Sequence, residues 1–331
     1  MTLESIPVSA MEKIGIGLDR PEDVVVGPDG RVWASDHLSA CAEIMPDGSL
    51  RRTGKTNGAP NGINMDQQCR IIIANFGIYD GVAGPLQRLD PESGDVEVLV
   101  SEVGGQVLTS SNYPVVATDG TIWCTHSTFA EQWPQALDGR TDGFVYRLTP
   151  DGIVHKEADG LKFANGCCLD AEEEFLYVNQ TSGGNVVRFP IGNDGSLGVR
   201  EDYGPMLGII PSPPKPSQEI DLDVRLSSEE VASLLPSSED RSNWAFTDGN
   251  GFDEEGNLWV TLPAANKVVA ITPAREVITI AHDPTGDMLN HPTNVTWGGA
   301  DRRDIYFGSI VADYVVKARS PVAGMAMVHQ R

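Results

Sequence analysis

Residues 247–261 read Thr-Asp-Gly-Asn-Gly-Phe-Asp-Glu-Glu-Gly-Asn-Leu-Trp-Val-Thr, and they contain the pattern that decides the fold. Asp248 comes first, a turn ends near Gly256, and a short strand of apolar and β-branched residues follows. This order occurs five more times, with strand cores that begin at Arg31, Arg70, Thr121, Phe175 and Asp304. A polar residue lies eight positions before the end of each turn, or seven in the second repeat: Glu22, Asn61, Asn112, Asn165, Asp248 and Asn294. Because equivalent residues of a repeat occupy equivalent positions in space, these six side chains are expected to point toward one axis.

The spacing of the repeats predicts an all-β fold, a six-bladed β-propeller formed by a single domain over residues 1–331. Successive turn ends are 38 to 53 residues apart, except for one interval of 83, which suits four-stranded blades with one insertion. Turn signals such as Pro28-Asp-Gly30 recur, and helical periodicity is nearly absent. A closed ring must pair its ends, so residues around Ser5 to Met11 are expected to complete a blade with C-terminal strands.

The long interval predicts an insertion at residues 202–243. Four prolines between positions 211 and 216 indicate a stiff, extended stretch. Ser227 or Ser228, followed by acidic residues and then Pro236, predicts one short helix. Long excursions from compact domains often serve as lids or as contacts with another subunit. We therefore expect this segment to cover the site or to mediate oligomerisation.

Charge and composition argue against several classes of protein. With 47 acidic and 24 basic residues, the formal net charge is −23; such a field repels phosphate, so nucleic acid and anionic membranes are poor partners. No apolar run approaches the roughly 20 residues that span a bilayer, and the first residues do not resemble a signal peptide. The cytoplasm is therefore the expected location. Five cysteines, including the neighbours Cys167 and Cys168, form no disulfide framework and are expected to be reduced.

Glu22, Asn165 and Asp248 offer two carboxylates and one amide oxygen to the predicted axis. Converging carboxylates repel each other unless a cation lies between them. Oxygen ligands without thiolate or imidazole favour one divalent cation, with Ca²⁺ as our first choice and Mg²⁺, Mn²⁺ or Zn²⁺ as alternatives. If Asp248 binds the cation through one oxygen, the other is available as a general base; otherwise Asp248 is only a ligand. The competing interpretation is that these polar residues merely cap turns.

Three more motifs extend the pattern: Pro21-Glu-Asp23 before Gly27-Pro-Asp-Gly-Arg-Val-Trp33, Ala164-Asn-Gly166 before a strand, and Thr293-Asn-Val-Thr-Trp-Gly-Gly-Ala-Asp-Arg-Arg-Asp-Ile-Tyr306 in the last repeat. Together with Thr247-Asp-Gly249, they make the chain similar to the senescence-marker, gluconolactonase and luciferin-regenerating enzyme family. The similarity covers nearly the whole chain apart from the insertion. It implies a six-bladed propeller, one divalent cation in the channel, and hydrolysis of a lactone or related ester.

Carried over residue by residue, the resemblance implies that Glu22, Asn165 and Asp248 bind the metal and that Asp248 acts as the base. It also implies that Asn112 contacts metal or substrate. Two positions depart from the family pattern. Tyr113 stands where members often have aspartate, and Ser110 stands where members that act on sugar lactones often have arginine. The missing arginine weakens the case for a sugar lactone.

Aromatic residues and histidines next to the strand cores are expected to reach the channel mouth, and such a lining suits an aromatic or largely apolar substrate. They are His37, His126, Phe129, Trp133, Phe163, Trp244 and Phe246. The predicted substrate contacts are Asn61, Asn112, Tyr113, His126, Trp133 and Phe163. The alternatives are that the aromatic rings pack between blades and that His126 is a hydrogen-bonded structural residue.

The leading prediction is a metal-dependent lactonase, a carboxylic ester hydrolase, for a small aromatic or apolar lactone. A paraoxonase-like esterase would share the propeller and calcium, but the sequence shows no histidine pair near the site of the kind it should have; spacing alone leaves His126 and His291 open. A strictosidine-synthase-like protein would need a catalytic glutamate without metal ligands. A non-catalytic propeller that binds a ligand or protein has no need of converging carboxylates.

Overall fold

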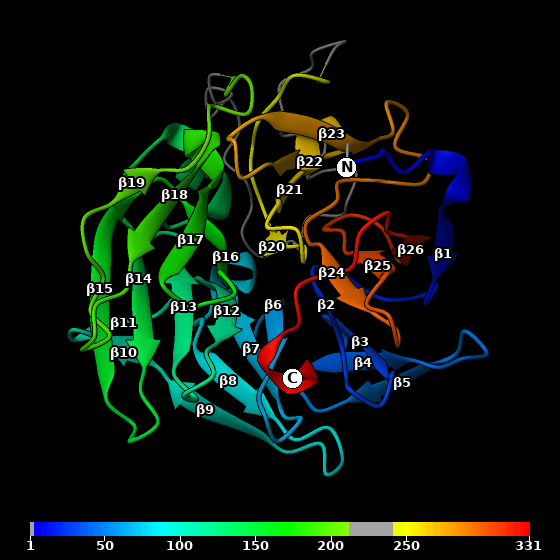
Figure 1. Ribbon diagram of the computed structural model, residues 1–331. Helices are drawn as coiled ribbons and strands as arrows, with labels where there is room; N and C mark the ends of the chain where they lie inside the picture. The colour runs from blue at the N-terminus through cyan, green and yellow to red at the C-terminus, as the bar shows by residue number, and fades with distance from the viewer. Residues whose placement is uncertain (1–2, 212–240) are drawn as a thin grey trace.

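The computed structural model describes residues 3–211 and 241–331, and six four-stranded antiparallel sheets form a ring in it (Figure 1). Each sheet runs from an innermost strand beside the axis to an outermost strand at the rim. The predicted all-β, six-bladed propeller is therefore confirmed. Every strand core that the sequence pattern identified is the second strand of a blade.

The first three blades are β2 to β5 (Val24–Val26, Val32–Ser35, Cys41–Ile44, Leu50–Thr53), β6 to β9 (Pro60–Met65, Ile71–Asn75, Leu86–Leu89, Val96–Val100) and β12 to β15 (Ser111–Val116, Ile122–His126, Gly143–Leu148, Val154–Leu161). The next two are β16 to β19 (Ala164–Leu169, Phe175–Gln180, Asn185–Pro190, Glu201–Asp202) and β20 to β23 (Asn250–Phe252, Leu258–Leu262, Lys267–Ile271, Val277–His282). A separate hairpin joins β10 (Glu102–Val103) to β11 (Gln106–Val107). The described helices are short 3₁₀ turns: η1 (Val8–Ala10), η2 (Gly77–Asp80), η3 (Trp133–Asp138), η4 (Thr181–Gly183), η5 (Pro263–Ala265) and η6 (Val328–Gln330).

The last blade closes the ring by combining both ends of the chain. It consists of β24 (Thr296–Gly298), β25 (Asp304–Phe307), β26 (Val315–Arg319) and, outermost, β1 (Glu12–Ile14). Closure by an N-terminal strand is thus confirmed, but the strand begins at Glu12, just beyond the predicted residues. Those residues include the 3₁₀ turn η1, and the main-chain N–H of Ile6 donates to Ile280 O in β23 (2.7 Å).

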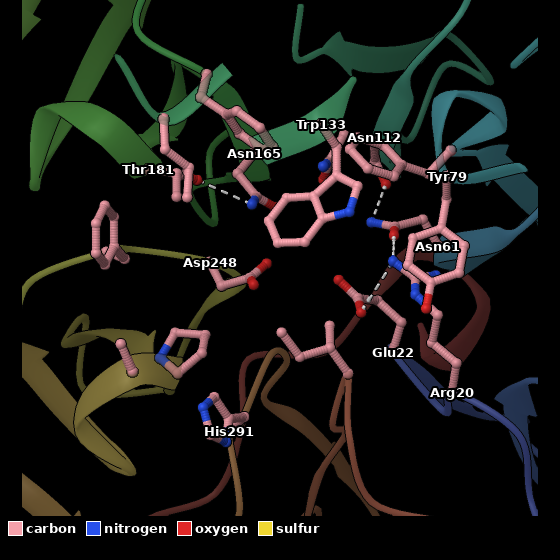
Figure 2. A pocket seen from close by; sticks show the side chains of 17 residues that line it. Arg20, Glu22, Asn61, Tyr79, Asn112, Trp133, Asn165, Thr181, Asp248 and His291 are labelled. Carbon is pink, nitrogen blue, oxygen red and sulfur yellow. Dashed lines mark hydrogen bonds and ion pairs between the residues drawn. The ribbon is translucent and has the colours of Figure 1, made fainter. Parts of the chain in front are cut away.

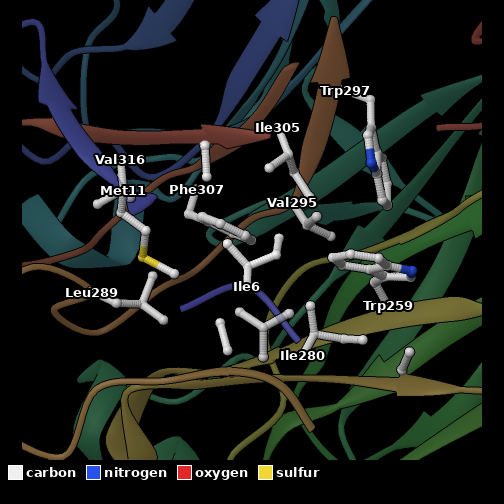
Figure 3. Close-up of a cluster of buried hydrophobic side chains, with 14 of the residues drawn as sticks. Ile6, Met11, Trp259, Ile280, Leu289, Val295, Trp297, Ile305, Phe307 and Val316 are labelled. Atoms are coloured by element: carbon white, nitrogen blue, oxygen red, sulfur yellow. The ribbon is translucent and has the colours of Figure 1, made fainter. Parts of the chain in front are cut away.

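Apolar side chains fill the spaces between neighbouring blades. In the cluster between the last two blades, Trp259 and Trp297 meet edge to face with ring centroids 5.1 Å apart, and Ile6 and Met11 pack into the same cluster (Figure 3). Burial of a large apolar side chain stabilises a fold by about 1.5–3 kcal/mol. This packing fixes each blade relative to its neighbours, and so it fixes the inner ends of the strands.

Irregular backbone in the innermost strands positions three of the polar residues of the sequence pattern. In β6, β12 and β16 the pairing register shifts between Pro60 and Ile63, Ser111 and Pro114, and Ala164 and Cys167. Asn61, Asn112 and Asn165 lie inside these shifts, and β-bulges of this kind redirect side chains. The strands also approach closely at the axis: a Cβ at Gly166 would lie 2.5 Å from Asp248 O, so only glycine fits there.

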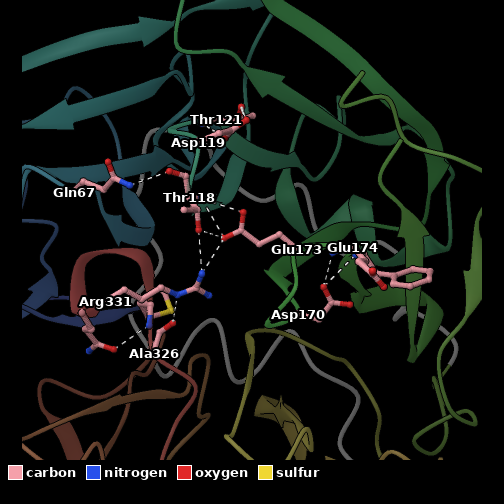
Figure 4. Close-up of polar contacts among 12 residues, drawn as sticks. Gln67, Thr118, Asp119, Thr121, Asp170, Glu173, Glu174, Ala326 and Arg331 are labelled. Carbon is pink, nitrogen blue, oxygen red and sulfur yellow. Dashed lines mark hydrogen bonds and ion pairs between the residues drawn. The ribbon is translucent and has the colours of Figure 1, made fainter. Parts of the chain in front are cut away.

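The innermost strands surround a channel along the axis of the ring. The C-terminal segment lies at the end of this channel where those strands finish (Figure 1). The imidazole of His329 lies between two carbonyls, with Nε2 3.1 Å from Val26 O and Nδ1 3.2 Å from Met65 O. Arg331 donates to Thr118 Oγ1 (3.0 Å) and forms an ion pair with Glu173 (3.4 Å) (Figure 4). The segment therefore ties together loops of several blades.

The predicted insertion at 202–243 lies mostly outside the described residues, as does the helix expected after Ser227 or Ser228. Its described ends meet: Ile209 N–H donates to Asn243 O (2.8 Å), and Ala245 N–H donates to Ile209 O (2.9 Å). Its proposed roles as a lid or subunit contact stay predictions. All five cysteines are unpaired. Within residues 3–211 and 241–331, no helix has the length and apolar character needed to cross a membrane.

Candidate active site

A cavity opens at the end of the channel where the innermost strands begin (Figure 2). Five of the six register residues line it: Glu22, Asn61, Asn112, Asn165 and Asp248. Loops that follow the second strands contribute much of the remaining wall, including Tyr79, Trp133 and Pro263. The space between its lining residues is about 820 Å³, which includes open solvent.

Arg20 organises one side of this cavity. Its guanidinium donates to Pro60 O (3.1 Å) and to Asn61 Oδ1 (2.7 Å), and it lies 3.4 Å from Glu22 Oε2 as an ion pair. The Arg20 guanidinium also lies over the Tyr79 ring, 4.8 Å from its centroid. Asn61 in turn donates to Asn112 O (3.2 Å). Asn61 is therefore occupied by protein partners, and Glu22 is held beside a fixed positive charge.

Other oxygens in the cavity lack hydrogen-bond donors. Asn165 uses its Nδ2 to donate to Thr181 Oγ1 (3.0 Å), and Thr181 donates to Thr247 O (2.7 Å), so the amide is oriented with its oxygen unbonded. Asn112 Oδ1 is likewise buried without a hydrogen-bond partner in the described structure, and Glu22 Oε2 has the ion pair with Arg20 but no hydrogen bond. Buried polar atoms are normally hydrogen-bonded, so three exceptions in one cavity indicate a binding function.

The two cavity carboxyls have raised pKa values. Burial raises the pKa of Asp248 well above its usual range, and the neighbouring Glu22 carboxylate raises it further. Burial also raises the pKa of Glu22, although the positive charge of Arg20 opposes this. Two carboxyls that face each other in a buried site cannot both ionise cheaply without a counter-charge. The pair therefore favours a bound cation.

The donor set fits a hard divalent cation. Glu22 and Asp248 supply carboxylates, and Asn112 and Asn165 supply amide oxygens that no protein donor occupies. Ca²⁺ is bound by such carboxylate and carbonyl oxygens. In the described parts of the chain, no three His, Cys, Asp or Glu side chains come together as a metal site, so the amide oxygens would have to complete the coordination. Asn112, predicted as a substrate contact, is thus also placed to contact a cation.

Asn294 and Tyr113 lie away from the cavity. Asn294 Nδ2 donates to Tyr113 OH (3.1 Å) and to a carboxylate oxygen of Asp23. Asp23 accepts a further bond from Ile63 N–H (2.6 Å). Tyr113 lines the opening at the opposite end of the channel instead. The structure therefore does not bring the predicted substrate contact Tyr113 together with Glu22 and Asp248.

His126, another predicted substrate contact, is fully buried outside the cavity. Its ring stacks between Phe129 (4.3 Å) and Phe144 (4.6 Å), and Nε2 accepts from Thr109 N–H (3.2 Å) and Ser110 N–H (3.3 Å). Burial lowers its pKa to about 3. These contacts match the structural alternative for His126. They also separate it from His291, which lines the cavity, so the two do not form the histidine pair of a paraoxonase-like site.

The aromatic wall is partly as predicted. Trp133, Phe163 and Phe246 line the cavity, whereas Trp244 packs behind Phe246 with ring centroids 6.3 Å apart. His37 is not among the lining residues; its Nε2 lies 2.6 Å from Asp80 Oδ2. Phe129 packs against His126.

Several cavity residues were missed by the sequence pattern: Arg20, Phe76, Tyr79, Leu137, Thr181, Pro263, Ala264 and Ile310. Most lie on loops between the second and third strands of a blade, which vary in length and do not follow the repeat register. Arg20 was the detectable exception, because it lies two residues before Glu22.

A family model described as "SMP-30/Gluconolactonase/LRE-like region" matches residues 55–205 and 212–311. The chain belongs to this family. The match confirms the resemblance found in the motifs and contains Asn165 and Asp248. Residues 8–38, which contain Glu22, match a second model described as the N-terminal part of strictosidine synthase-like proteins.

Curated relatives of this SMP-30/gluconolactonase-like chain include a gluconolactonase of Zymomonas mobilis, 26% identical over 46% of this chain and 41% of the relative. A 6-deoxy-6-sulfogluconolactonase of Pseudomonas putida is 23% identical over 70% of this chain and 77% of the relative. The chain spans about half the length of the first curated relatives it matches: 41%, 56% and 46%.

Solved structures with the same fold include a gluconolactonase from Xanthomonas campestris, with TM-score 0.67, 21% identity, and coverage of 93% of this chain and 89% of that one. Regucalcin from Agrobacterium tumefaciens, described as a calcium-binding protein, has TM-score 0.68 and 14% identity, with 97% of both chains covered. At these identities the likeness establishes the fold alone.

Proposed function

We propose that this protein hydrolyses a lactone with the help of one divalent cation, with Ca²⁺ as the first candidate, and that the lactone is aromatic or largely apolar. The observation that carries the proposal is the meeting of the Glu22 and Asp248 carboxyls with the buried amide oxygens of Asn112 and Asn165, which have no donor in the described structure. The names of the relatives, which are lactonases of sugar-derived substrates, support the reaction class. Glu22, Asn165 and Asp248 would hold the cation.

The residues of the site would divide the reaction between them. When bound, the cation would polarise the lactone carbonyl and stabilise the charge that develops on its oxygen. Asp248 would take a proton from the attacking water as the new C–O bond forms, and it would return that proton to the alkoxide as the ring C–O bond breaks. Glu22 would be held in position by Arg20. The product is a hydroxy acid, and Asp248 is regenerated.

The side chains that line the cavity support the preference for an apolar lactone. Phe163, Phe246 and Ile310 offer contact area without hydrogen bonds, and Trp133 adds a large ring with one N–H donor. A polyhydroxylated sugar needs many polar partners. Ser110, at the position where sugar lactonases of the family often have arginine, is fully buried, and its Oγ donates to Thr128 O (2.7 Å). The cavity arginine is instead Arg20, whose guanidinium already bonds Pro60 and Asn61.

The test is hydrolysis of a panel of aldonolactones, aromatic lactones and aliphatic lactones. Chelator-treated protein is assayed alone and with added Ca²⁺, Mg²⁺, Mn²⁺ or Zn²⁺. We expect activity on aromatic or aliphatic lactones that disappears with the chelator and returns with a cation. Folded protein that is inactive on every lactone with every cation would refute the proposal. Activity restricted to aldonolactones would refute only the substrate preference.

A further inference from the structure

Four buried side-chain atoms around the cavity have no hydrogen-bond partner among the described residues: Glu22 Oε2, Asn112 Oδ1, Asn165 Oδ1 and His291 Nε2. The first three are oxygens that suit the cation. The fourth is a nitrogen, and Glu22, Asp248 and His291 do not form a metal-binding group in the described structure. His291 Nε2 therefore needs a different explanation.

The backbone conformation of His291 and its neighbours' contacts fix the orientation of its side chain. Its backbone is left-handed, with φ of 46°, which is uncommon for a residue other than glycine. The main-chain N–H donates to Asn266 Oδ1 (2.9 Å), and the following Pro292 pairs with Ser309. Surrounding contacts must maintain a backbone conformation of this kind, and such residues cluster at functional sites.

The hydrogen bond to Asn290 decides the tautomer of His291. Nδ1 lies 2.7 Å from Asn290 Oδ1, an acceptor, so Nδ1 carries the proton and Nε2 presents a lone pair. The residue is only 9% exposed, so water has limited access to that lone pair. Burial, with a smaller effect of the Arg241 charge, lowers its pKa to about 4, which keeps the ring neutral at neutral pH. His291 is thus a fixed hydrogen-bond acceptor beside an aromatic cavity.

Two other polar side chains of the wall are already engaged. Thr181 accepts from Asn165 and donates to Thr247 O, and Asn61 bonds Arg20 and Asn112. A buried acceptor without a donor is unfavourable, because the loss of its contacts with water is not compensated. A ligand that brings a donor to Nε2 recovers this energy, whereas a ligand of the same shape without one does not.

We propose that His291 Nε2 accepts a hydrogen bond from a hydroxyl or amide N–H of the substrate, so that the site selects apolar lactones that carry such a donor. This inference rests on the proposed lactone-binding function of the cavity. It adds a specificity residue that acts apart from the cation site.

The test uses sets of aromatic lactones that share one skeleton: ring-hydroxylated, ring-methoxylated, N-acylamino-substituted and unsubstituted. The methoxy compound keeps the size and the acceptor but lacks the donor. Binding is measured by tryptophan fluorescence, since Trp133 lines the cavity, and hydrolysis is measured as kcat/KM. For the wild type we expect roughly 10- to 100-fold tighter binding of the hydroxyl or N-acylamino compound than of the methoxy compound. Comparing these two donor-bearing compounds identifies the kind of donor.

Two variants with the same amide chemistry provide the matched comparison. His291→Asn tolerates left-handed backbone, but its amide is too short to reach the position of Nε2; His291→Gln carries an acceptor to that position. The Asn variant should lose the donor preference yet still bind the unsubstituted lactone, and the Gln variant should retain part of the preference. Circular dichroism and thermal unfolding confirm that both are folded.

The outcomes separate this inference from the proposed function. Donor preference that depends on His291, without hydrolysis, would support the inference and refute the hydrolase. Hydrolysis without donor preference, or a preference that persists in His291→Asn, would overturn the inference alone. Failure of the wild type to bind any of these aromatic probes would overturn the inference together with the proposed substrate preference, and the wider lactone panel would still test the hydrolase.

Discussion

The two ends of the channel are built from the same six inner strands, but they differ in the polar groups that meet there. At the cavity end, carboxylate and amide oxygens lie buried without donors. At the opposite end, the C-terminal segment supplies partners: His329 faces two carbonyls, and Arg331 bonds Thr118 and Glu173. Buried atoms without a partner also occur at the opposite end, where Asn250 Oδ1 and Trp297 Nε1 belong to residues that line the opening. The converging carboxyls of Glu22 and Asp248 therefore distinguish the cavity end as the functional one, because burial and their mutual repulsion raise the pKa of Asp248. The C-terminal contacts hold the ring together at the other end.

The largest expected effect comes from Asp248. Replacement by Asn preserves the shape but removes the base and one negative charge, and it should lower kcat/KM about 10²–10⁴-fold. Steady-state hydrolysis of the preferred lactone with saturating cation provides the measurement. The matched control is Glu173→Gln at the opposite end, which should leave kcat/KM unchanged. Near-normal activity in Asp248→Asn would contradict the assignment of the base.

Glu22 is expected to matter mainly for cation binding. Glu22→Gln removes a carboxylate whose Oε2 no donor occupies and leaves Arg20 without its ion-pair partner. We expect the cation Kd, measured by calorimetry, to rise at least about tenfold, because a charge-assisted contact is lost. Raising the cation concentration should partly restore hydrolysis by Glu22→Gln. An unchanged Kd would remove Glu22 from the ligand set.

The raised pKa of Asp248 predicts how pH affects the cation-free protein. In the folded state Asp248 keeps its proton to a higher pH than in the unfolded chain, where its pKa is about 3.9. The folded state therefore binds more protons above about pH 4, and stability falls as the pH rises through the folded pKa. Glu22 acts in the same direction.

Thermal unfolding of chelated protein between about pH 5 and pH 8 tests this expectation. The wild type should lose more stability over this range than Asp248→Asn, which cannot ionise there, and added Ca²⁺ should reduce the loss in the wild type. The comparison with Asp248→Asn removes the general repulsion among the 47 acidic residues, since 46 remain. Equal slopes for the two proteins would show that Asp248 is already ionised without the cation.

The blades and their inner positions could be predicted from the sequence because the same spacing of residues recurs in each blade. Strand cores such as Leu258–Leu262 and inner positions such as Asn165 follow a fixed spacing, so six blades and five cavity residues could be identified. Tyr113 and His126 were assigned to the cavity by proximity in sequence. In a strand, neighbouring side chains point to opposite sides, and so Tyr113, next to Asn112, faces elsewhere. His126 ends the second strand of its blade and packs between two phenylalanine rings.

The wall of the cavity could not be predicted in this way. Tyr79, Leu137 and Ile310 lie on loops of unequal length, and their direction depends on tertiary packing. His291 was noticed only as a histidine; its importance comes from a left-handed backbone and a bond to Asn290 that spacing does not reveal. Functional positions that violate local rules are the ones that pattern analysis misses.

The smallest expected effect is at the end of the chain. Arg331→Ala removes a partly exposed ion pair with Glu173 and side-chain hydrogen bonds to Thr118 Oγ1 and Ala326 O. Exposed pairs contribute about 0–1 kcal/mol, so the free energy of unfolding in urea should fall by less than about 1 kcal/mol. Hydrolysis and cation affinity should not change, because Arg331 lies at the end of the channel away from Asp248. A loss of activity in Arg331→Ala without a loss of stability would show that the two ends are coupled, and it would contradict the division of roles between them.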